Sequence, residues 1–455
     1  IMTSRETRED VRLKYRYWDL RNQKVKDNIV FRSKVIAYLR EKMTEMGFLE
    51  IQTPILCASS PEGARDYIVP SRKYKGKFYA LPQAPQQYKQ LLMVSGFDKY
   101  FQIAPCFRDE DARADRSPGE FYQLDFEMSF ATQEDVFRTG EEVLSATFEK
   151  FAPEGYAVTK APYPVISYKQ AMLEFGTDKP DLRNPLRIID LTEFFQACSF
   201  KPFHGRTVRA IKVHADMSKG FHEKLLKFAT DMGMGGLGYL EVAEDMSYKG
   251  PIDKFIPEDK KSELAELAGL AAGDTIFFIA DREERAAYYA GQIRTELGQK
   301  LELIEKNAYR FCYINDFPMF ELDSDTKQIG FTHNPFSMPQ GGLEALTTMD
   351  PLEILAYQYD IVCNGVELSS GAVRNHDMDI MVKAFEIAGY DEETLKSKFG
   401  ALYNAFQFGA PPHAGMAPGV DRMIMLLRNE ENIREVIAFP MSGSAQDLMC
   451  GAPND

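Results

Sequence analysis

The chain has 455 residues, of which 44% are apolar and 12% are aromatic. A chain of this length and composition forms two or three domains with sizeable cores, which excludes an intrinsically disordered or low-complexity protein. Its formal net charge is −14, whereas general binding to nucleic acid requires an excess of Lys and Arg. Any contact with RNA must therefore use a local basic surface, and we expect no DNA partner.

Residues 1–42 are a candidate for such a surface, because twelve basic residues stand there against six acidic ones. A solvated segment with internal ion pairs explains this composition equally well.

The six cysteines are widely spaced and form no CxxC pair, so we expect reduced thiols in the cytoplasm rather than disulfides or a zinc site. We expect no membrane partner, because we find neither a signal peptide nor an apolar run of about 18 residues.

The first 170 residues alternate between predicted helices and strands. Apolar positions at helical spacing predict a helix over 28–46, which Gly47 ends, and a strand follows over 48–53. Further strands are predicted at 78–81, 100–107 and 121–130.

Residues 171–305 differ in composition from the first part and contain few polar residues that could take part in catalysis or binding. The features there are a glycine-rich segment at 233–238, a helix at 262–270 and an apolar strand at 275–280. From residue 306 onward the strands, glycines and charged residues of the first part return. This predicts one core, 1–170 and 306–455, which is interrupted by an inserted domain over 171–305.

The strand at 121–130 carries polar side chains on one face. Gln123, Asp125 and Glu127 share that face, because side chains alternate along a strand. The alternation alone also fits an ordinary half-exposed hairpin. The loop before this strand favours a functional interpretation, because its arginines and carboxylates suit a phosphate and its counter-ions. These loop residues are Arg108, Asp109, Glu110, Asp111, Arg113, Asp115 and Arg116.

A second candidate region lies in the last third of the chain. We interpret 352–363 as a helix and 366–374 as a strand. Glu367 on that strand and Asp360 before it offer oxygen ligands for Mg²⁺, and Arg374 could bind a carboxylate through two hydrogen bonds. A surface ion pair accounts for the same residues without any function.

The segment 415–422 is rich in glycine and ends in Arg422, before an apolar run at 423–427. Glycine lets a backbone approach a ligand closely, and a helix N-terminus with an arginine favours anions. A plain strand-to-helix turn is the simpler interpretation of this segment alone, and His333 by itself fits a structural role.

The sequence contains no GxSxG, HExxH or Walker A motif. It offers arginines, carboxylates and glycines instead of a nucleophile with its base. We therefore expect phosphoryl or nucleotidyl chemistry that depends on positioning and on the stabilisation of charge.

In combination, these segments resemble the class II aminoacyl-tRNA synthetases, and specifically the aspartyl enzymes of the bacterial type. The resemblance covers essentially the whole chain. Residues 28–54 resemble motif 1, the dimer-interface element, 106–127 resemble motif 2, and 415–422 resemble motif 3. Other family-typical segments are 8–17, 61–67 and 176–185.

This resemblance implies an α+β fold, in which helices flank a mainly antiparallel sheet, and an obligate homodimer. The insert at 171–305 is similar to the extra domain of the bacterial aspartyl enzymes. Members of the family usually begin with an anticodon-binding barrel, and we expect that this chain starts where such a domain ends. The implied activity is that of an ATP- and Mg²⁺-dependent ligase, which forms aspartyl-adenylate and transfers the aspartyl group to tRNA(Asp).

The resemblance also implies a role for individual residues. Those implied to be catalytic are Arg108, Glu367 and Arg422. Those implied to bind ATP are Arg108, Asp109, Glu110, Phe121, Glu367, Gly419, Val420, Asp421 and Arg422. Those implied to bind aspartate are Glu62, Gln86, Lys89, Arg108, Asp125, His333 and Arg374. Those implied to hold Mg²⁺ are Glu367 and Asp360.

Three alternatives stay open at this point. tRNA(Asn) could be a second substrate, since the sequence does not reveal the range of tRNAs that are charged. An asparaginyl relative would share the same motifs, and so would a non-catalytic paralogue that only binds RNA. A lysyl enzyme is disfavoured, because Arg374 and Lys89 would repel a lysine side chain.

Overall fold

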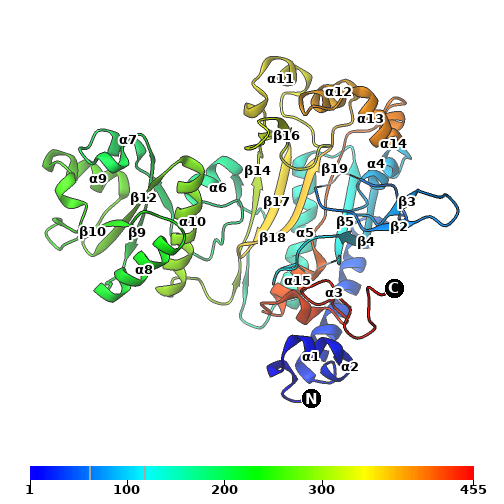
Figure 1. Ribbon diagram of the computed structural model, residues 1–455, viewed down its shortest axis with the longest axis horizontal. Coiled ribbons are helices and arrows are strands. Elements are labelled where there is room, and N and C mark those ends of the chain that lie inside the picture. Colours follow the sequence, from blue (N-terminus) through cyan, green and yellow to red (C-terminus); the bar gives the residue numbers. More distant parts are fainter. Residues whose placement is uncertain (61–62, 117–118) are drawn as a thin grey trace. The chain divides into compact units, whose positions relative to one another are not determined.

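The computed structural model describes residues 1–60, 63–116 and 119–455, and the chain divides into two compact units (Figure 1). The first unit comprises residues 1–163, 315–361 and 367–455. The second unit comprises residues 164–314 and 362–366. The described residues implied to form the site all belong to the first unit.

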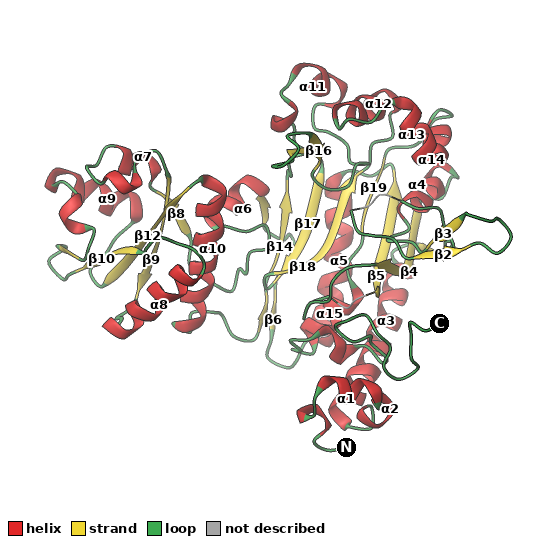
Figure 2. Ribbon diagram, viewed as in Figure 1, coloured by secondary structure: helices red, strands yellow, loops and turns green. Residues whose placement is uncertain are grey.

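A mainly antiparallel sheet forms the centre of the first unit (Figure 2). Its strands follow the order β1-β4-β5-β19-β18-β17. Their bounds are Leu49–Glu50 (β1), Lys99–Arg108 (β4), Gly119–Ser129 (β5), His413–Met416 (β19), Val366–Val373 (β18) and Gln358–Cys363 (β17). Strand β1 runs parallel to β4, whereas β5 is antiparallel to β4 and β19, and β19 is antiparallel to β18. The expected α+β fold is confirmed.

Helices pack against this sheet. Helix α3 contacts α5 and α15, while α4 and α15 contact β5 and α5 contacts β19. These four helices are Gln23–Glu45 (α3), Gln86–Val94 (α4), Gln133–Phe151 (α5) and Val420–Leu427 (α15). The shorter helices are Glu9–Lys14 (α1), Arg16–Asp19 (α2), Gly342–Thr348 (α11), Met378–Ile387 (α12), Glu392–Lys398 (α13) and Gly400–Phe406 (α14). Within the described ranges, no helix combines the length and the apolar character that a membrane crossing demands.

Short strands complete the first unit. Ile68–Pro70 (β2) pairs with Phe78–Ala80 (β3), and Phe320–Leu322 (β15) pairs with Ile329–Phe331 (β16). A further strand is Ala157–Val158 (β6). The strand predicted at 78–81 is therefore confirmed as β3.

Most elements predicted for this unit are present. The helix predicted at 28–46 is α3, which begins earlier because the side chain of Asn22 accepts a hydrogen bond from the backbone N of Lys24 and caps it. The strand predicted at 48–53 is reduced to the two residues of β1. The two long strands and the strand at 366–374 are confirmed as β4, β5 and β18.

The helix predicted at 352–363 is wrong. A single 3₁₀ turn at Pro351–Glu353 is followed by strand β17, all of whose residues are buried. Strand β17 contains two buried polar residues, Gln358 and Asp360, beside its apolar ones. The mixed pattern over 352–363 is too short and irregular to distinguish a strand from a helix.

The basic segment 1–42 is extensively ion-paired. Arg12 donates hydrogen bonds to Asp19 and Glu435, and Arg32 donates to Asp421 at 2.6 Å. The Asp19 and Asp421 side chains are almost fully buried, so these pairs are inside the unit. The interpretation as an ion-paired segment therefore holds for these arginines.

The second unit contains its own antiparallel sheet, in the order β11-β10-β12-β9-β8. Residues of β12 alternate between two apolar layers, with Ile276 and Phe278 in one layer and Phe277 and Ile279 in the other. The sheet strands are Ile188–Asp190 (β8), Thr207–His214 (β9), Gly238–Val242 (β10), Tyr248–Lys249 (β11) and Asp274–Asp281 (β12). The helices are Tyr168–Glu174 (α6), Thr192–Gln196 (α7), Lys219–Asp231 (α8), Lys261–Ala268 (α9) and Glu283–Lys300 (α10). Other strands are Val165–Ser167 (β7), Ala308–Tyr309 (β13) and Phe311–Asn315 (β14). The helix predicted at 262–270 and the strand at 275–280 are confirmed.

Candidate active site

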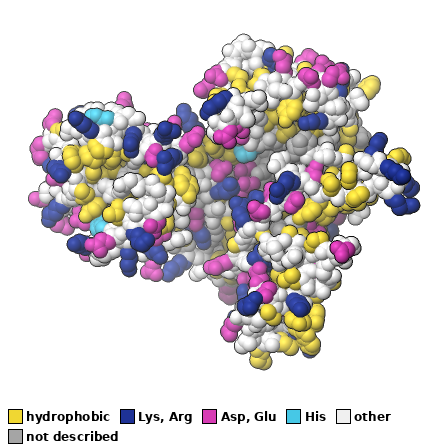
Figure 3. All heavy atoms as spheres, viewed as in Figure 1, with side chains coloured by type: hydrophobic (Ala, Val, Ile, Leu, Met, Phe, Trp, Pro, Cys, Tyr) yellow, Lys and Arg dark blue, Asp and Glu magenta, His cyan; other side chains and the backbone are white. Residues whose placement is uncertain are grey.

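Two cavities of the first unit share part of their walls. The larger has a volume of about 760 Å³ and the smaller about 150 Å³. The residues that line both are Arg108, Gln123, Glu367, Ser370 and Ala417. In the space-filling view, acidic and basic side chains gather together in the hollow of this unit's face (Figure 3). The shared walls make the two cavities one continuous site.

A buried ion-pair network around β5 forms one wall of the larger cavity. Asp125 and Glu127 are both 0% exposed. Asp125 accepts hydrogen bonds from Lys89 Nζ at 2.6 Å and from the Tyr100 hydroxyl at 2.9 Å. A buried carboxylate is stable only with such partners. The alternative interpretation of this strand pair as an ordinary half-exposed hairpin is therefore wrong.

Glu127 is paired with Arg374 in the same network. Its Oε1 and Oε2 accept hydrogen bonds from Nε and Nη2 of Arg374 at 2.9 and 3.3 Å, and Lys89 Nζ lies 3.5 Å from Oε2. Burial opposes the charge of Glu127, but Arg374 and Lys89 hold its pKa below the ordinary value. Burial likewise opposes the charge of Arg374, and Glu127 raises its pKa. Two cations thus balance two carboxylates in the absence of a ligand.

Arg374 keeps one edge for a ligand. Among the described residues, no side chain or backbone group accepts a hydrogen bond from its Nη1. Because Glu127 engages Nε and Nη2, the guanidinium is held in one orientation at the wall of the larger cavity. A guanidinium fixed in this way suits a carboxylate ligand.

The close approach of β5 and β19 depends on a glycine. Gly415 is the register partner of Glu127. A Cβ atom at this position would lie 2.2 Å from Oε2 of Glu127, which is far inside van der Waals contact. This explains one glycine of the segment 415–422 by packing around the ion pair.

The smaller cavity is lined by two aromatic residues, Phe121 and Tyr122, and by three arginines, of which Arg108 and Arg422 are the best fixed. Arg422, on the first turn of α15, donates from Nη1 to the carbonyl oxygen of Glu367 at 2.7 Å, and burial lowers its pKa. The guanidinium of Arg108 lies over the ring of Phe121, 4.9 Å from the centroid. One aromatic ring and two fixed cations suit a flat ligand with phosphates, such as a nucleotide.

Asp421 is already occupied by protein groups. Its Oδ1 accepts a hydrogen bond from Arg32 at 2.6 Å, and its Oδ2 accepts one from the backbone N of Tyr122 at 2.8 Å. The side chain therefore ties α15 to α3 and to β5. Through this link it fixes the turn of helix that carries Arg422.

Most other residues implied by the family resemblance line one of the two cavities. These are Glu110, Gly419, Gln86 and His333. Those that line neither cavity are Asp109 and Val420. Glu62 lies outside the described residues. Sequence reasoning did not assign Glu127 to the site, although its place on the same strand face as Asp125 was the available signal.

Asp360 and Glu367 converge on one hydroxyl group. The Oγ of Ser370 lies 2.7 Å from Oδ1 of Asp360 and 3.0 Å from Oε1 of Glu367. A hydroxyl carries a single hydrogen, so it cannot donate fully to both carboxylates. Two hard oxygen donors fit Mg²⁺. In the described part of the chain no group of three or more His, Cys, Asp or Glu side chains could hold a metal ion, so a cation here would take further oxygen ligands from phosphates or water.

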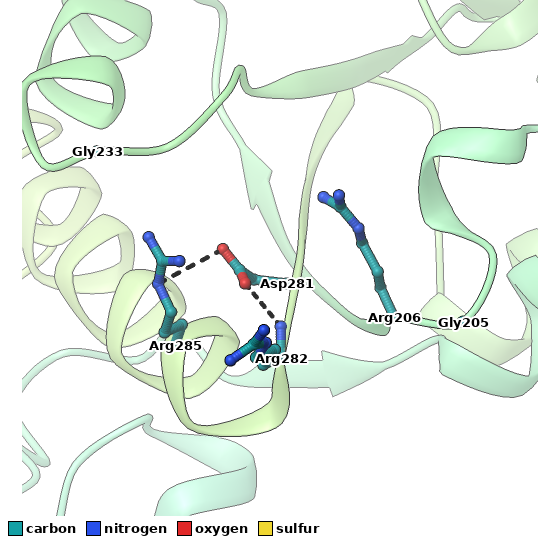
Figure 4. Close-up of a pocket in the computed structure, with 6 residues that line it drawn as sticks. All are labelled: Gly205, Arg206, Gly233, Asp281, Arg282 and Arg285. Carbon is teal, nitrogen blue, oxygen red and sulfur yellow. Dashed lines mark hydrogen bonds and ion pairs between the residues drawn. The ribbon is translucent and has the colours of Figure 1, made fainter. Parts of the chain in front are cut away.

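A separate cavity of about 570 Å³ lies in the second unit (Figure 4). Asp281 accepts a hydrogen bond from the backbone N of Arg282 at 2.7 Å and lies 3.8 Å from Arg285, whereas Arg206 reaches in from the other side. The three arginine side chains are exposed to solvent. The charged residues of this cavity are exposed, whereas those of the larger cavity in the first unit form a buried ion-pair network. We therefore place the candidate active site in the first unit.

The chain matches known proteins along nearly its whole length. Residues 8–443 match the family described as tRNA synthetases class II (D, K and N). The chain is 59% identical to an aspartate–tRNA(Asp/Asn) ligase of Ehrlichia canis (strain Jake), over 100% of this chain and 78% of that protein. It is also 59% identical to one of Gluconobacter oxydans (strain 621H), over 98% of this chain and 75% of that protein.

Solved structures of low sequence identity share the fold. An asparaginyl-tRNA synthetase from Pyrococcus horikoshii, complexed with asparaginyl-adenylate, superposes with a TM-score of 0.52 at 17% identity, covering 96% of this chain and 73% of that chain. An aspartyl-tRNA synthetase from Entamoeba histolytica gives a TM-score of 0.51 at 21% identity, covering 95% of this chain and 62% of that chain.

The family match and the relatives that align over the full chain show that the chain belongs to the class II aminoacyl-tRNA synthetases. Within the family it is similar to bacterial aspartate–tRNA(Asp/Asn) ligases over its full length. The resemblance expected from the three motifs is confirmed.

Proposed function

We propose that this protein uses ATP to activate L-aspartate and transfers the aspartyl group to tRNA. The observation that carries the proposal is the pair of buried cations, Lys89 and Arg374, at the wall of the larger cavity. Glu127 orients the guanidinium of Arg374, and the edge of the guanidinium that Glu127 does not engage suits the side-chain carboxylate of aspartate. The similarity to aspartate–tRNA(Asp/Asn) ligases supports the same assignment.

The chemistry requires no nucleophile from the protein. An oxygen of the substrate α-carboxylate attacks the α-phosphorus of ATP in line, the bond to the β-phosphate oxygen breaks, and pyrophosphate leaves. Arg108 lines both cavities, so it is placed to stabilise the negative charge that develops at the α-phosphate. A terminal ribose hydroxyl of the tRNA then attacks the aspartyl carbonyl carbon and loses its proton. The bond from that carbon to the phosphate oxygen breaks, and AMP leaves with this oxygen and the electron pair of the bond.

The nucleotide would bind in the smaller cavity. Phe121 and Arg422 would hold the adenine ring by stacking, and Glu110 and Gly419 would line the same space. Asp421 would act through the position of α15, because its carboxylate is bound to Arg32 and to the backbone of Tyr122.

Discrimination against asparagine would come from charge. A neutral amide in place of the carboxylate would leave the Arg374 edge without a counter-charge in a buried site. Polar sites of this kind discriminate by about 10⁴–10⁵ when a buried partner is left unsatisfied. His333, which lines the cavity and meets the ring of Phe317 edge-on at 4.9 Å, would close over the amino acid.

Mg²⁺ would be held by Glu367 and Asp360, whose oxygens converge at Ser370. When bound, the ion supplies positive charge that screens the phosphates and helps to orient them. The two carboxylates and Ser370 supply the protein side of that site.

Four finer assignments belong to this proposal. We assign residues 171–305 to the inserted domain, and the assignment is supported by the second compact unit, which comprises residues 164–314 and 362–366. We assign a homodimer, supported by exposed apolar side chains in and after β1, where Leu49 and Leu56 are each 53% exposed. We assign the cytoplasm, since none of the six cysteines, all within the described residues, forms a disulfide. We also assign tRNA(Asn) as a possible second acceptor beside tRNA(Asp), as the names of the relatives indicate.

Amino-acid-dependent ATP–pyrophosphate exchange tests the proposal. We expect exchange with aspartate and none with asparagine or lysine. Exchange with asparagine alone would indicate an asparaginyl enzyme. A folded protein that binds ATP but shows no exchange with any of the three would contradict the proposal and indicate a non-catalytic paralogue.

A further inference from the structure

A chain of buried hydrogen bonds leads away from the larger cavity. Gln86, which lines the cavity, donates from Nε2 to Oε1 of Gln90 at 2.9 Å. Nε2 of Gln90 lies 3.1 Å from Nε2 of His413. Nδ1 of His413 lies 2.8 Å from the carbonyl oxygen of Pro411. Gln90 and His413 are both 0% exposed, so water does not compete for these bonds.

The direction of every bond in this chain follows from its last member. The carbonyl oxygen of Pro411 can only accept, so Nδ1 of His413 must carry the hydrogen. In a neutral ring Nε2 is then an acceptor, and Gln90 must present its NH₂ group to it. The carbonyl of Gln90 consequently faces Gln86, which must donate its own NH₂ group.

The chain of hydrogen bonds therefore ends at the carbonyl oxygen of Gln86. Among the described residues, no group donates a hydrogen bond to it. If the order were reversed, Gln86 would present its NH₂ group to the cavity instead. A single tautomer thus decides whether this side chain offers the cavity an acceptor or a donor.

The surroundings of His413 favour a neutral ring. Burial lowers the pKa of His413 from 6.5. The charged or titratable groups that face it are Glu127 on β5, Arg374 after β18 and His376 in the following loop. Glu127 opposes the shift, whereas Arg374 and His376 add to it. Helices α4 and α14 present the uncharged Gln90 and the ring of Phe406, whose centroid is 6.1 Å away.

We propose that His413 and Gln90 are positioning residues that hold the carbonyl oxygen of Gln86 toward the ammonium group of the amino-acid substrate. The inference rests on the proposed function: Gln86, which the family resemblance implies to bind aspartate, lines the same cavity as Lys89 and Arg374 and would accept a hydrogen bond from the ammonium end of the substrate. Neither His413 nor Gln90 touches the substrate. They act by excluding the orientation in which an NH₂ donor would face a positive charge.

The first experiment measures Gln90→Met by ATP–pyrophosphate exchange. Methionine has a similar length but can neither donate to His413 nor accept from Gln86. We expect the KM for aspartate to rise about tenfold, since hydrogen bonds to charged groups are the strong ones, while kcat and the KM for ATP change little.

Succinate separates positioning from a general structural effect, because it is aspartate without the ammonium group. Inhibition by succinate should be the same in Gln90→Met and in the wild type. Asn184→Leu is the control for loss of a buried amide outside the site: Asn184, in the second unit, donates from Nδ2 to the carbonyl oxygen of Arg294 at 3.0 Å and is not part of the chain of bonds. That variant should affect aspartate and succinate alike. An equal loss for both ligands in Gln90→Met would overturn the proposal, as would unchanged aspartate kinetics.

A second measurement does not depend on activity. In protein labelled with ¹⁵N-histidine, NMR should show that Nδ1 of His413 is protonated and Nε2 is not at neutral pH. The signals of this ring are assigned as those that disappear in His413→Gln. The opposite tautomer, or a fully protonated ring, would contradict the proposed order. If the wild type lacked exchange with aspartate, the proposed function would fail, whereas exchange without an effect of Gln90→Met would refute the positioning role alone.

Discussion

Glu127 and Arg374 form a two-bond ion pair in the interior of the catalytic sheet, with Nε–Oε1 and Nη2–Oε2 distances of 2.9 and 3.3 Å. Both side chains are almost completely buried, and Gly415 leaves the space in which they meet. The pair orients the remaining edge of the guanidinium, and its two buried charges offset each other. It joins the architecture of the sheet to the selection of the substrate.

Removal of one partner should destabilise the fold strongly. We expect Glu127→Ala to lower the free energy of unfolding by about 3 kcal/mol or more, because Arg374 would remain as a buried charge without its counter-ion. Denaturant titration followed by circular dichroism measures this. Glu50→Ala is the matched control, since its partner Arg40 is 48% exposed, and we expect a loss below about 1 kcal/mol there. Equal losses in the two variants would refute the argument.

The same pair predicts a pH dependence of stability. The pKa of Glu127 in the folded protein is below the ordinary value of 4.5. Above pH 4.5 the carboxyl group is ionised in both the folded and the unfolded state, so its contribution to stability is complete. As the pH falls below 4.5 the unfolded state takes up the proton first, and stability declines until the pH reaches the folded pKa. Glu127→Gln should lack this part of the acid dependence, which unfolding titrations from pH 6 downward would reveal.

Arg374→Lys should separate aspartate recognition from ATP binding. A lysine keeps the positive charge, but it cannot bind Glu127 and a ligand carboxylate with separate edges of one rigid plane. We expect the KM for aspartate to rise at least about tenfold and the dissociation constant for ATP to stay close to that of the wild type. Isothermal titration with ATP, beside exchange kinetics, provides the comparison. Unchanged aspartate kinetics would exclude the assigned contact.

Glu367→Gln should weaken the response to Mg²⁺. The change keeps the size of the side chain and one oxygen but removes the charge that a hard cation requires. We expect the Mg²⁺ concentration for half-maximal exchange to shift upward, with no change in the fold. Ser369→Ala alters a neighbouring residue of the same cavity without loss of charge and serves for comparison. A metal titration curve that did not move would show that the ion is held elsewhere.

Much of the sheet could be predicted from the sequence, because β4, β5 and β18 combine alternation with a polar face. Strand β17 could not, since polar Gln358 and Asp360 are buried with its apolar residues, and the pattern over 352–363 also fits a helix. The start of α3 was missed for a local reason: the cap by Asn22 precedes the first apolar position of the pattern.

The site was predictable in its residue types but not in its connections. Asp125 and Arg374 could be proposed from chemistry and family resemblance. That Glu127 rather than Asp125 is the partner of Arg374 depends on the register of β19 between β5 and β18, which no pattern within either segment encodes. The direction of the hydrogen bonds from His413 to Gln86 likewise arises from a fold that joins residues far apart in the chain.

The strand order also has a consequence for synthesis on the ribosome. Strands β4 and β5 are made well before β19, which pairs with β5 and carries Gly415. A hairpin that carries Asp125 and Glu127 must therefore wait, hydrated and unpaired along one edge, until Arg374 and then β19 leave the exit tunnel. The two carboxylates therefore lose their water only after β19 has emerged, long after the strand that carries them, and the active site cannot form before that point.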